Sequence, residues 1–270
     1  MNTRIIFCTI FFVVLSGAAP AQQDSATRFV RLGVFGSAGA NVHNPQSFGS
    51  FLDQRYRQYA GFYPKLLFEP VSAFGWSAGG LVELPIFDRV GLSMRVSYSQ
   101  VGARFVAFES TKVGIVDYDP IPMVVFRDIQ IEHSADANSV AFLGIEPYLT
   151  YRPLDMLILY VGVPFGTPLN RRYSYAERIL DTDPRVIWIN QTKVRNQYQD
   201  DITSMSVLNI GLSVGAGYEI PLDSNNQWLL AIEAFYTRFL SSLLQAPDMW
   251  TLEHLRSGVS LRYAPFAYGK

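Results

Sequence analysis

The stretch from Val207 to Ile220 reads VLNIGLSVGAGYEI, and two kinds of residue alternate along it. One set is apolar and consists of Leu208, Ile210, Leu212, Val214, Ala216, Tyr218 and Ile220. The other set is small, polar or charged and consists of Asn209, Gly211, Ser213, Gly215, Gly217 and Glu219. Because successive side chains of a β-strand point to opposite faces, this pattern predicts a strand with one lipid-like face and one polar face.

The same alternation recurs along the chain and predicts eight strands in all. They are expected at about 28–42, 74–86, 90–108, 138–152, 156–166, 204–221, 227–243 and 252–265. Tight turns at 87–89, 153–155 and 223–226 alternate with other connections. Three of these are long, at about 43–73, 109–137 and 167–203, and a short one lies near 244–251. This alternation is typical of transmembrane β-barrels. The sequence therefore predicts an all-β fold, an eight-stranded antiparallel up-and-down transmembrane β-barrel with short periplasmic turns and long extracellular loops.

Residues 1–21 have the layout of a cleaved secretory signal peptide. Arg4 gives a short positive start, the stretch 5–15 is apolar, and small residues lead to an Ala-x-Ala end at Ala21. We therefore expect export and a mature domain of residues 22–270. The single cysteine, Cys8, lies within this leader, so we expect no disulfide and no Cys-ligated zinc in the mature domain.

The composition of the 270 residues narrows the function classes further. Only 17% are charged and 14% are aromatic, which excludes a disordered chain. The formal net charge of −1 provides no basic field, so no nucleic-acid partner is expected. Beyond residue 21 no uncharged apolar run reaches the length that a transmembrane helix needs. The histidines and acids show no metal-ligand spacing, so neither a metal nor another cofactor is expected.

Three predicted strands share a pattern in which Gly and Glu lie on one face and Pro follows. The pattern occurs at 80–85 (GLVELP), 144–147 (GIEP) and 217–221 (GYEIP). With the hairpin rhythm and the leader, it makes the chain resemble the small outer-membrane β-barrels of Gram-negative bacteria, similar to the PorT-like and OmpA/OmpX-type barrels. The last predicted strand also fits the barrel-assembly signal of this class at Arg256, Gly258, Leu261 and Tyr263.

The resemblance implies a location in the outer membrane, with outer-membrane lipid and the barrel-assembly machinery as partners. It also implies that the long loops face outward, where a protein or glycan partner can meet them. The loop segment 171–175 (RRYSY) has side chains suited to either partner. The last strand is expected to end near residue 265, which puts Tyr268 beyond it.

The interior of an eight-stranded barrel is just wide enough for side chains. Alternation assigns four arginines and four glutamates to this interior: Arg31, Glu83, Arg95, Glu146, Glu219, Glu233, Arg256 and Arg262. A balanced set suits a closed lumen, because an unpaired buried charge is strongly destabilising. The expected function is therefore structural or based on interactions through the extracellular loops. A small pore or transport accessory is the alternative if the charged lumen conducts.

Two further alternatives belong to other classes. An outer-membrane lipid-modifying enzyme, such as a lipid A acyltransferase or deacylase, needs a nucleophile and a base near the outer rim. The weak candidates are His43, His254 and Ser257, with Glu253 adjacent, and we expect no enzymatic activity. A soluble lipocalin-like binder would instead bury its apolar face and expose its charges.

Two apolar stretches lie within the long connections, at 121–132 and 186–189. Long loops without secondary structure are uncommon, so both stretches are expected to extend strands above the membrane as hairpins. Their exposed edges would then recruit a partner by strand addition. The alternative is that the two stretches pair with each other.

Overall fold

The computed structural model describes residues 28–47, 68–117, 123–183, 186–187, 191–245 and 249–268. The predicted signal peptide, residues 1–21, lies outside the described residues. The regular structure of the described part consists of thirteen β-strands. This part of the chain contains no helix that is long and apolar enough to cross a membrane.

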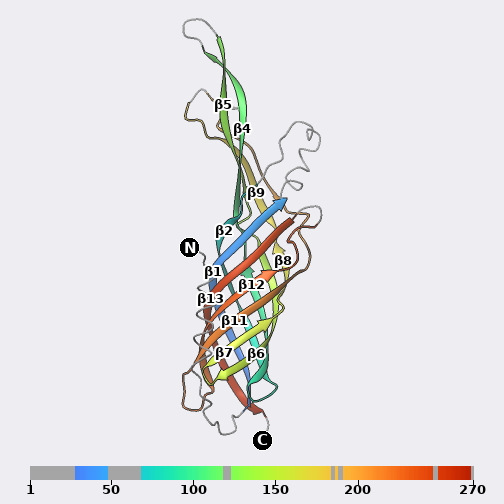
Figure 1. The fold of residues 1–270 in the computed structure, drawn as a ribbon, viewed down its shortest axis with the longest axis vertical. Coiled ribbons are helices and arrows are strands. Elements are labelled where there is room, and N and C mark those ends of the chain that lie inside the picture. Colours follow the sequence, from blue (N-terminus) through green and yellow to red (C-terminus); the bar gives the residue numbers. More distant parts are fainter. Residues whose placement is uncertain are drawn as a thin grey trace.

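Nine of the strands form a sheet that closes on itself. In pairing order they are β12 (Trp228–Phe239), β13 (Met249–Tyr268), β1 (Arg28–Ser47), β2 (Val71–Pro85), β3 (Val90–Gln100), β6 (Ala141–Leu154), β7 (Leu157–Gly162), β11 (Asn209–Pro221) and β8 (Phe165–Asn170). Pairing of β11 with β12 completes the ring. Because β7 and β8 share one position between β6 and β11, the ring is the predicted eight-stranded antiparallel barrel (Figure 1).

The interruption between β7 and β8 has a local cause in two prolines. Proline has no N–H for a ladder hydrogen bond. The Val163 N–H donates to the Pro147 carbonyl at 3.2 Å, and the Gly211 N–H donates to the Pro164 carbonyl at 2.9 Å, but neither proline returns a bond. The strand therefore continues in register across the break while losing hydrogen bonds to both neighbours.

The barrel strands are steeply tilted. Successive paired residues on β12, β11, β7, β6, β3 and β2 connect His254 on β13 with Arg31 on β1. The residue after Arg31, Leu32, pairs with Tyr263 on β13, so the path around the barrel does not return to His254. A stagger of about ten residues in an eight-stranded barrel corresponds to strands inclined by about 40° to the axis. Residues far apart along the sequence therefore meet at one height in the lumen.

Four further strands form a second sheet, which we call the outer sheet. Its order is β10 (Val194–Asp201), β9 (Arg172–Ile179), β5 (Met123–Asp136) and β4 (Arg104–Asp117). The outer sheet extends beyond one end of the barrel (Figure 1). Since β4 follows β3, β5 leads into β6 and β9 follows β8, it continues one part of the barrel wall.

The outer sheet occupies much of what the sequence predicted as loops. Residues 123–132 form part of the β4–β5 hairpin, as expected, but the predicted connection at 167–203 wrongly omits β9 and β10. The hairpin prediction for 186–189 is wrong for 186–187, which lie outside any strand, and 188–189 lie outside the described residues. Instead, Val186 joins a buried apolar cluster with Ile129, Ile131 and Ile179.

The last strand is longer than predicted. The backbone of β13 pairs with β1 as far as Tyr268, which faces Arg28, so the prediction that Tyr268 lies beyond the strand is wrong. A register shift accompanies the step from Val30 to Leu32 on β1. Such a bulge interrupts the two-residue alternation, and this explains why the sequence pattern ended too early.

Candidate functional site

The outward face of the barrel carries an uncharged band. On β13 the outward residues between Glu253 and Tyr263 carry no charge, and the same holds on β12 between Trp228 and Arg238. These outward residues are Leu255, Ser257, Val259 and Leu261 on β13 and Leu230, Ile232, Ala234 and Tyr236 on β12. The ten residues from Glu253 to Tyr263, on a strand inclined by about 40°, rise about 25 Å. This is the height of the apolar band of transmembrane barrels.

Aromatic side chains mark both edges of the band. At the edge near the short turns, the rings of Trp228 and Tyr263 lie 4.6 Å apart. At the opposite edge, the Trp76 ring lies 5.5 Å from that of Tyr98, and its indole N–H donates to the Gln100 side chain at 2.6 Å. Amphipathic rings with a polar tip favour membrane–water interfaces, so this placement fits the two edges of a bilayer.

The inward face of the same strands is charged. The structure places all eight predicted residues in the lumen and adds a ninth, Arg152. Arg152 lies six residues after Glu146 on β6, so alternation assigns both to the same face. The sequence prediction omits it because it ends the strand at this residue. The lumen of the described chain thus holds five arginines and four glutamates.

Arg262 is the centre of the network at the short-turn end. Its side chain is only 1% exposed, and it donates to Glu219 at 2.5 Å, to Glu83 at 3.1 Å and also to Glu233. Arg152 donates to Glu219 at 3.0 Å and pairs with Glu83, and Arg31 lies within 3.6 Å of both carboxylates. Each of these buried carboxylates therefore meets several guanidinium groups, which offsets the cost of removing it from water.

Arg95 lies one layer further from the short turns, inside a cage of aromatic rings. Its guanidinium carbon is 4.6–5.6 Å from four ring centroids, those of Phe35, Tyr148, Tyr160 and Phe235. Its Nη2 donates to Glu233 at 2.6 Å, and the Tyr160 hydroxyl donates to the same oxygen at 2.6 Å. The cage combines cation–π attraction with a buried ion pair.

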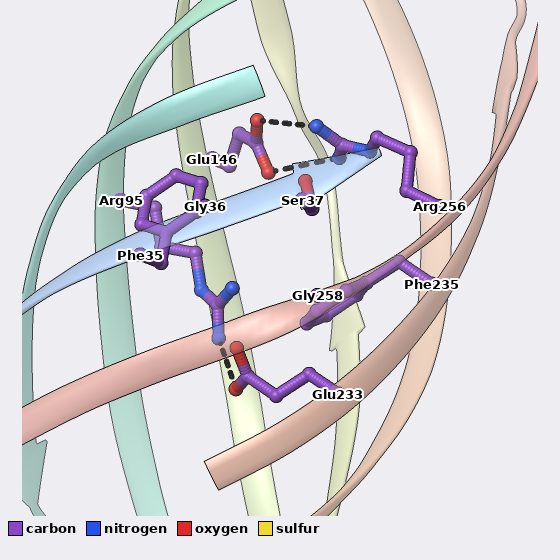
Figure 2. Close-up of a pocket in the computed structure, with 9 residues that line it drawn as sticks. All are labelled: Phe35, Gly36, Ser37, Arg95, Glu146, Glu233, Phe235, Arg256 and Gly258. Carbon is purple, nitrogen blue, oxygen red and sulfur yellow. Dashed lines mark hydrogen bonds and ion pairs between the residues drawn. The ribbon is translucent and has the colours of Figure 1, made fainter. Parts of the chain in front are cut away.

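Arg256 and Glu146 form a third layer, in which their side chains point toward each other (Figure 2). Their two ion-pair distances are 3.2 and 3.4 Å, and Glu146 also accepts bonds from the Ser97 hydroxyl at 2.8 Å and the Tyr148 hydroxyl at 2.9 Å. A cavity of about 10 Å³ separates this pair from Arg95 and Glu233. That volume holds about one water molecule, so the two ion pairs are separated by little free space.

An apolar cap lies above the charged layers, where the barrel meets the outer sheet. Its buried residues are Phe68, Val101, Ala103, Phe105, Ala107, Ala135, Ala137, Val140, Phe142, Tyr173, Tyr175, Ile202, Met205, Leu243, Leu244, Trp250 and Leu252. The Trp250 indole N–H donates to His43 Nδ1 at 3.1 Å, and the Trp250 ring packs edge-on against Phe105 at 5.2 Å. The cap is therefore a second buried layer at this end of the barrel, made by apolar packing rather than by charge.

The weak catalytic candidates do not form a site. His43 and His254 are both buried inside the barrel, where His43 contacts Trp250 and the His254 ring packs on Phe239. Ser257 is exposed on the opposite, outward face of β13. Glu253 also faces outward and pairs with Arg238. Alternation itself separates them, because 257 and 254 differ by an odd number and lie on opposite faces.

A polar relay crosses the buried face of the outer sheet and includes residues of all four of its strands. His133 on β5 lies between Glu109 Oε2, at 3.1 Å from Nε2, and the Tyr175 hydroxyl, at 2.7 Å from Nδ1. The Tyr175 hydroxyl also donates to Glu177 at 3.4 Å. Glu177 accepts from Arg195 at 2.6 Å and from Asn196 at 2.8 Å, both on β10, and Asn196 has a left-handed φ of 52°. The sequence analysis did not single out this relay, because its members come from predicted loops.

The remaining predicted site residues are placed as follows. In the 171–175 segment Arg171 and Arg172 are exposed, but Tyr173 and Tyr175 are buried in the apolar cap and cannot contact a sugar directly. In the assembly signal, Leu261 and Tyr263 face outward and Arg256 faces the lumen. A Cβ at Gly258 would lie 2.1 Å from the Gly36 carbonyl oxygen, so the β1–β13 contact requires glycine there.

The described residues show no metal centre. Among them, no group of three or more His, Cys, Asp or Glu side chains is arranged to hold a metal ion. The carboxylates of the lumen are instead occupied by arginines.

No protein-family model and no curated protein matches the chain. Solved structures of small outer-membrane barrels resemble it. Ail, the attachment invasion locus protein of Yersinia pestis, solved with the heparin analogue sucrose octasulfate, is 11% identical with a TM-score of 0.33, over 87% of this chain and 99% of Ail. Neisserial surface protein A is 11% identical with a TM-score of 0.34, over 85% and 96%. The outer-membrane protease OmpT from Escherichia coli is 9% identical with a TM-score of 0.33, over 90% and 99%. The likeness is loose and says nothing about activity or ligands.

Proposed function

We propose that this chain is an outer-membrane β-barrel with a closed lumen, and that it acts as a structural or interaction protein through its outer sheet. The observation that carries the proposal is a closed ring with charges inside and an uncharged band outside. A soluble lipocalin-like binder needs the reverse arrangement, with apolar residues inside. In water the exposed apolar band would promote aggregation, whereas in a bilayer it would contact the hydrocarbon core.

Closure of the ring supports insertion into a membrane. A sheet edge in hydrocarbon would leave backbone N–H and C=O groups without partners, each costing several kcal/mol. Here β1 pairs with both β2 and β13, and β12 pairs with both β13 and β11. The barrel wall therefore has no unpaired strand edge at β1 or β12.

The two closures of the lumen support a role other than conduction. The charged layers hold arginines and glutamates in direct contact, and the apolar cap fills the end next to the outer sheet. A pore would require both layers to open. We also propose no catalytic role, because His254 and Ser257 lie on opposite faces of β13.

The outer sheet supports an interaction role. Its order leaves β4 and β10 as its two edges within the described residues. The β4–β5 ladder runs without a register shift, whereas β10 has one between Arg195 and Tyr198. Because bulges blunt an edge against added strands, β4 is the edge better suited to bind an extended segment of a partner.

The first test is heat-modifiable mobility of the chain isolated from outer membranes. A folded barrel resists unfolding by detergent and shifts in gel electrophoresis only after heating. Gly258→Ala should reduce the folded fraction strongly, because the new Cβ would meet the backbone of β1. Gly36→Ala is the matched control, since a Cβ there meets nothing within 4 Å. Folded protein in the soluble periplasmic fraction would refute the membrane location.

The second test is conductance in planar bilayers. A lumen closed by ion pairs and an apolar cap should give no channels, or very small ones. Stable channels of the size seen with large porins would overturn the closed-lumen proposal and favour the pore or transport accessory.

A further inference from the structure

Strand β10 is held to the outer sheet along one side. Within the described chain it pairs with β9 alone, and its residues are half-buried or exposed. A register shift between Arg195 and Tyr198 interrupts the pairing, and Asn196 lies at this break with a φ of 52°. An edge strand with an interrupted ladder and little buried surface separates from its sheet more easily than a central strand does.

Side-chain contacts to Glu177 bridge this break. Glu177 lies on β9 opposite Arg195, accepts from Arg195 Nε at 2.6 Å and accepts from Asn196 Nδ2 at 2.8 Å. Because Glu177 is only 3% exposed, water weakens these charge-assisted bonds little. The position of this carboxylate therefore contributes directly to the attachment of β10.

The same carboxylate is an acceptor of the polar relay. The Tyr175 hydroxyl oxygen lies 2.7 Å from His133 Nδ1 and 3.4 Å from Glu177 Oε1. A hydroxyl has one proton, so it donates to one of these two acceptors at a time. The state of His133 Nδ1 therefore decides whether Glu177 receives this bond.

The two protonation states of His133 give two arrangements of the relay. When the ring is neutral, Nε2 donates to the Glu109 carboxylate at 3.1 Å, which leaves Nδ1 as the acceptor for Tyr175. When the ring is cationic, both nitrogens donate. Nδ1 then donates to the Tyr175 oxygen, and the hydroxyl proton is free for Glu177.

The surroundings of His133 favour its cationic form. The charged and titratable described residues on this face are Glu109 on β4, Tyr175 and Glu177 on β9, and Arg195 and Tyr198 on β10. Among them a neutral His133 leaves two glutamates with one arginine, whereas a cationic His133 balances the charges. Burial of the ring opposes its charge. Two carboxylates, one at 3.1 Å and one directly opposite on β9, offset that cost.

We infer that the relay is a pH-sensitive switch that controls the attachment of β10. Histidine ordinarily changes its charge between pH 5 and 8. At the acidic end of this range, cationic His133 leaves the Tyr175 hydroxyl to Glu177, and this bond fixes the carboxylate against Arg195 and Asn196. At the alkaline end the hydroxyl donates to His133, Glu177 loses a bond, and β10 separates from β9 more often. The uncovered edge of β9 is then open to an added strand.

Hydrogen exchange measured by mass spectrometry on the full chain in detergent micelles tests the switch. The protection of the β10 amides is compared at pH 5.5 and 7.5, after correction for the intrinsic pH dependence of exchange. We expect about tenfold greater protection at pH 5.5, and no such change in β12. Equal protection of β10 at both pH values, or greater protection at pH 7.5, would overturn the inference.

Two variants and a matched control identify the groups responsible. His133→Gln cannot take up a proton in this range, and Tyr175→Phe cannot pass the change on to Glu177, so both should abolish the pH dependence of β10 protection. Glu132→Gln changes the residue before His133, which pairs with Arg104 on the outward face, and should retain the tenfold effect. Heat-modifiable mobility shows that each variant contains a folded barrel. A β10 that remains pH-dependent in His133→Gln or Tyr175→Phe would mean that another group titrates, and the inference would be wrong.

The ring nitrogens of His133 provide a test in the parent chain. Nitrogen-15 chemical shifts distinguish the two neutral tautomers from each other and from the cation. We expect the proton on Nε2 at pH 7.5 and protons on both nitrogens at pH 5.5. A neutral ring with its proton on Nδ1 at pH 7.5 would leave the Tyr175 hydroxyl free for Glu177 at both pH values, and would overturn the inference even if β10 protection varied with pH.

Discussion

The barrel and the outer sheet are joined by strands that follow one another directly along the chain, yet the polarity of their faces is inverted. The inward residues of β3 are Ser93, Arg95, Ser97 and Ser99, and those that follow are Val101, Ala103, Phe105 and Ala107. The outward residues change in the opposite sense, from Leu92, Met94, Val96 and Tyr98 to Gln100 and Arg104. Alternation defines two faces in both regions, but the surrounding solvent decides which face is polar.

The inversion recurs on the neighbouring strand pair. The outward residues of β5 include Asp128, Gln130 and Glu132, whereas those of β6 include Leu143, Ile145 and Leu149. Both changes occur next to the Trp76–Tyr98 edge of the band. In the proposed membrane location the barrel interior must hold the polar groups, and it does so with ion pairs. Outside the membrane the interior of the sheet can be apolar, and among the described residues the His133 relay interrupts it.

The largest expected effect is the loss of a lumen arginine. Arg262→Leu leaves Glu83, Glu219 and Glu233 short of a shared partner and should lower the free energy of unfolding by about 3–5 kcal/mol. The matched change in the outer sheet is Arg104→Gln, which removes a half-exposed ion pair with Glu132 and should cost less than about 1 kcal/mol. Urea titration in detergent micelles measures both, and similar losses would show that the lumen network is solvated.

A lysine placed on the outward face tests the inversion directly. Val96→Lys puts a charge near the middle of the uncharged band and should destabilise the inserted barrel by about 2–4 kcal/mol. Phe108→Lys puts the same charge on the outward face of β4, where the side chain is 59% exposed, and should change stability by no more than about 0.5 kcal/mol. Unfolding from lipid vesicles gives the comparison. If Phe108→Lys is as damaging as Val96→Lys, β4 also lies in lipid and the boundary is misplaced.

The smallest expected effect concerns the relay of the outer sheet. Tyr175→Phe removes the hydroxyl between His133 and Glu177 and should cost about 1–2 kcal/mol, felt mainly in β5 and β9. Hydrogen exchange should therefore accelerate in these strands and remain unchanged in β12 and β13. Tyr98→Phe is the control on the band. Uniform acceleration throughout the molecule would mean that the two regions unfold as one unit.

The two regions also differ in how far the sequence predicts them. On β11 each inward residue was predictable from alternation alone, and Glu219 lies in the lumen for that reason. Arg152 follows the same rule, and it was not assigned to the lumen only because the predicted strand ends at this residue. Which arginine meets which glutamate was not predictable, because the stagger of the ring brings Arg262 to Glu83 and no local pattern encodes a stagger.

The outer sheet was harder to predict because its polar face is outward. Strands β9 and β10 carry Arg172, Arg178 and Asp201 at their surface, which makes them similar to loop sequences. The buried relay depends on β10 and its bulge at Asn196, and neither is visible without the pairing. The weak candidates His254 and Ser257 do not meet for a simpler reason, since proximity along a strand does not imply a shared face.

The pairing of β1 with β13 determines when the barrel can close during folding. The facing residues Arg28 and Tyr268 are 240 positions apart, so the ring can close only after β13, the last of the described strands along the chain, has been synthesised. Loop closure over such a separation is slow compared with hairpin formation. Until β13 pairs with it, β1 has an unpaired edge to which other chains can add. The yield of closed barrels therefore depends on the lifetime of this unpaired edge.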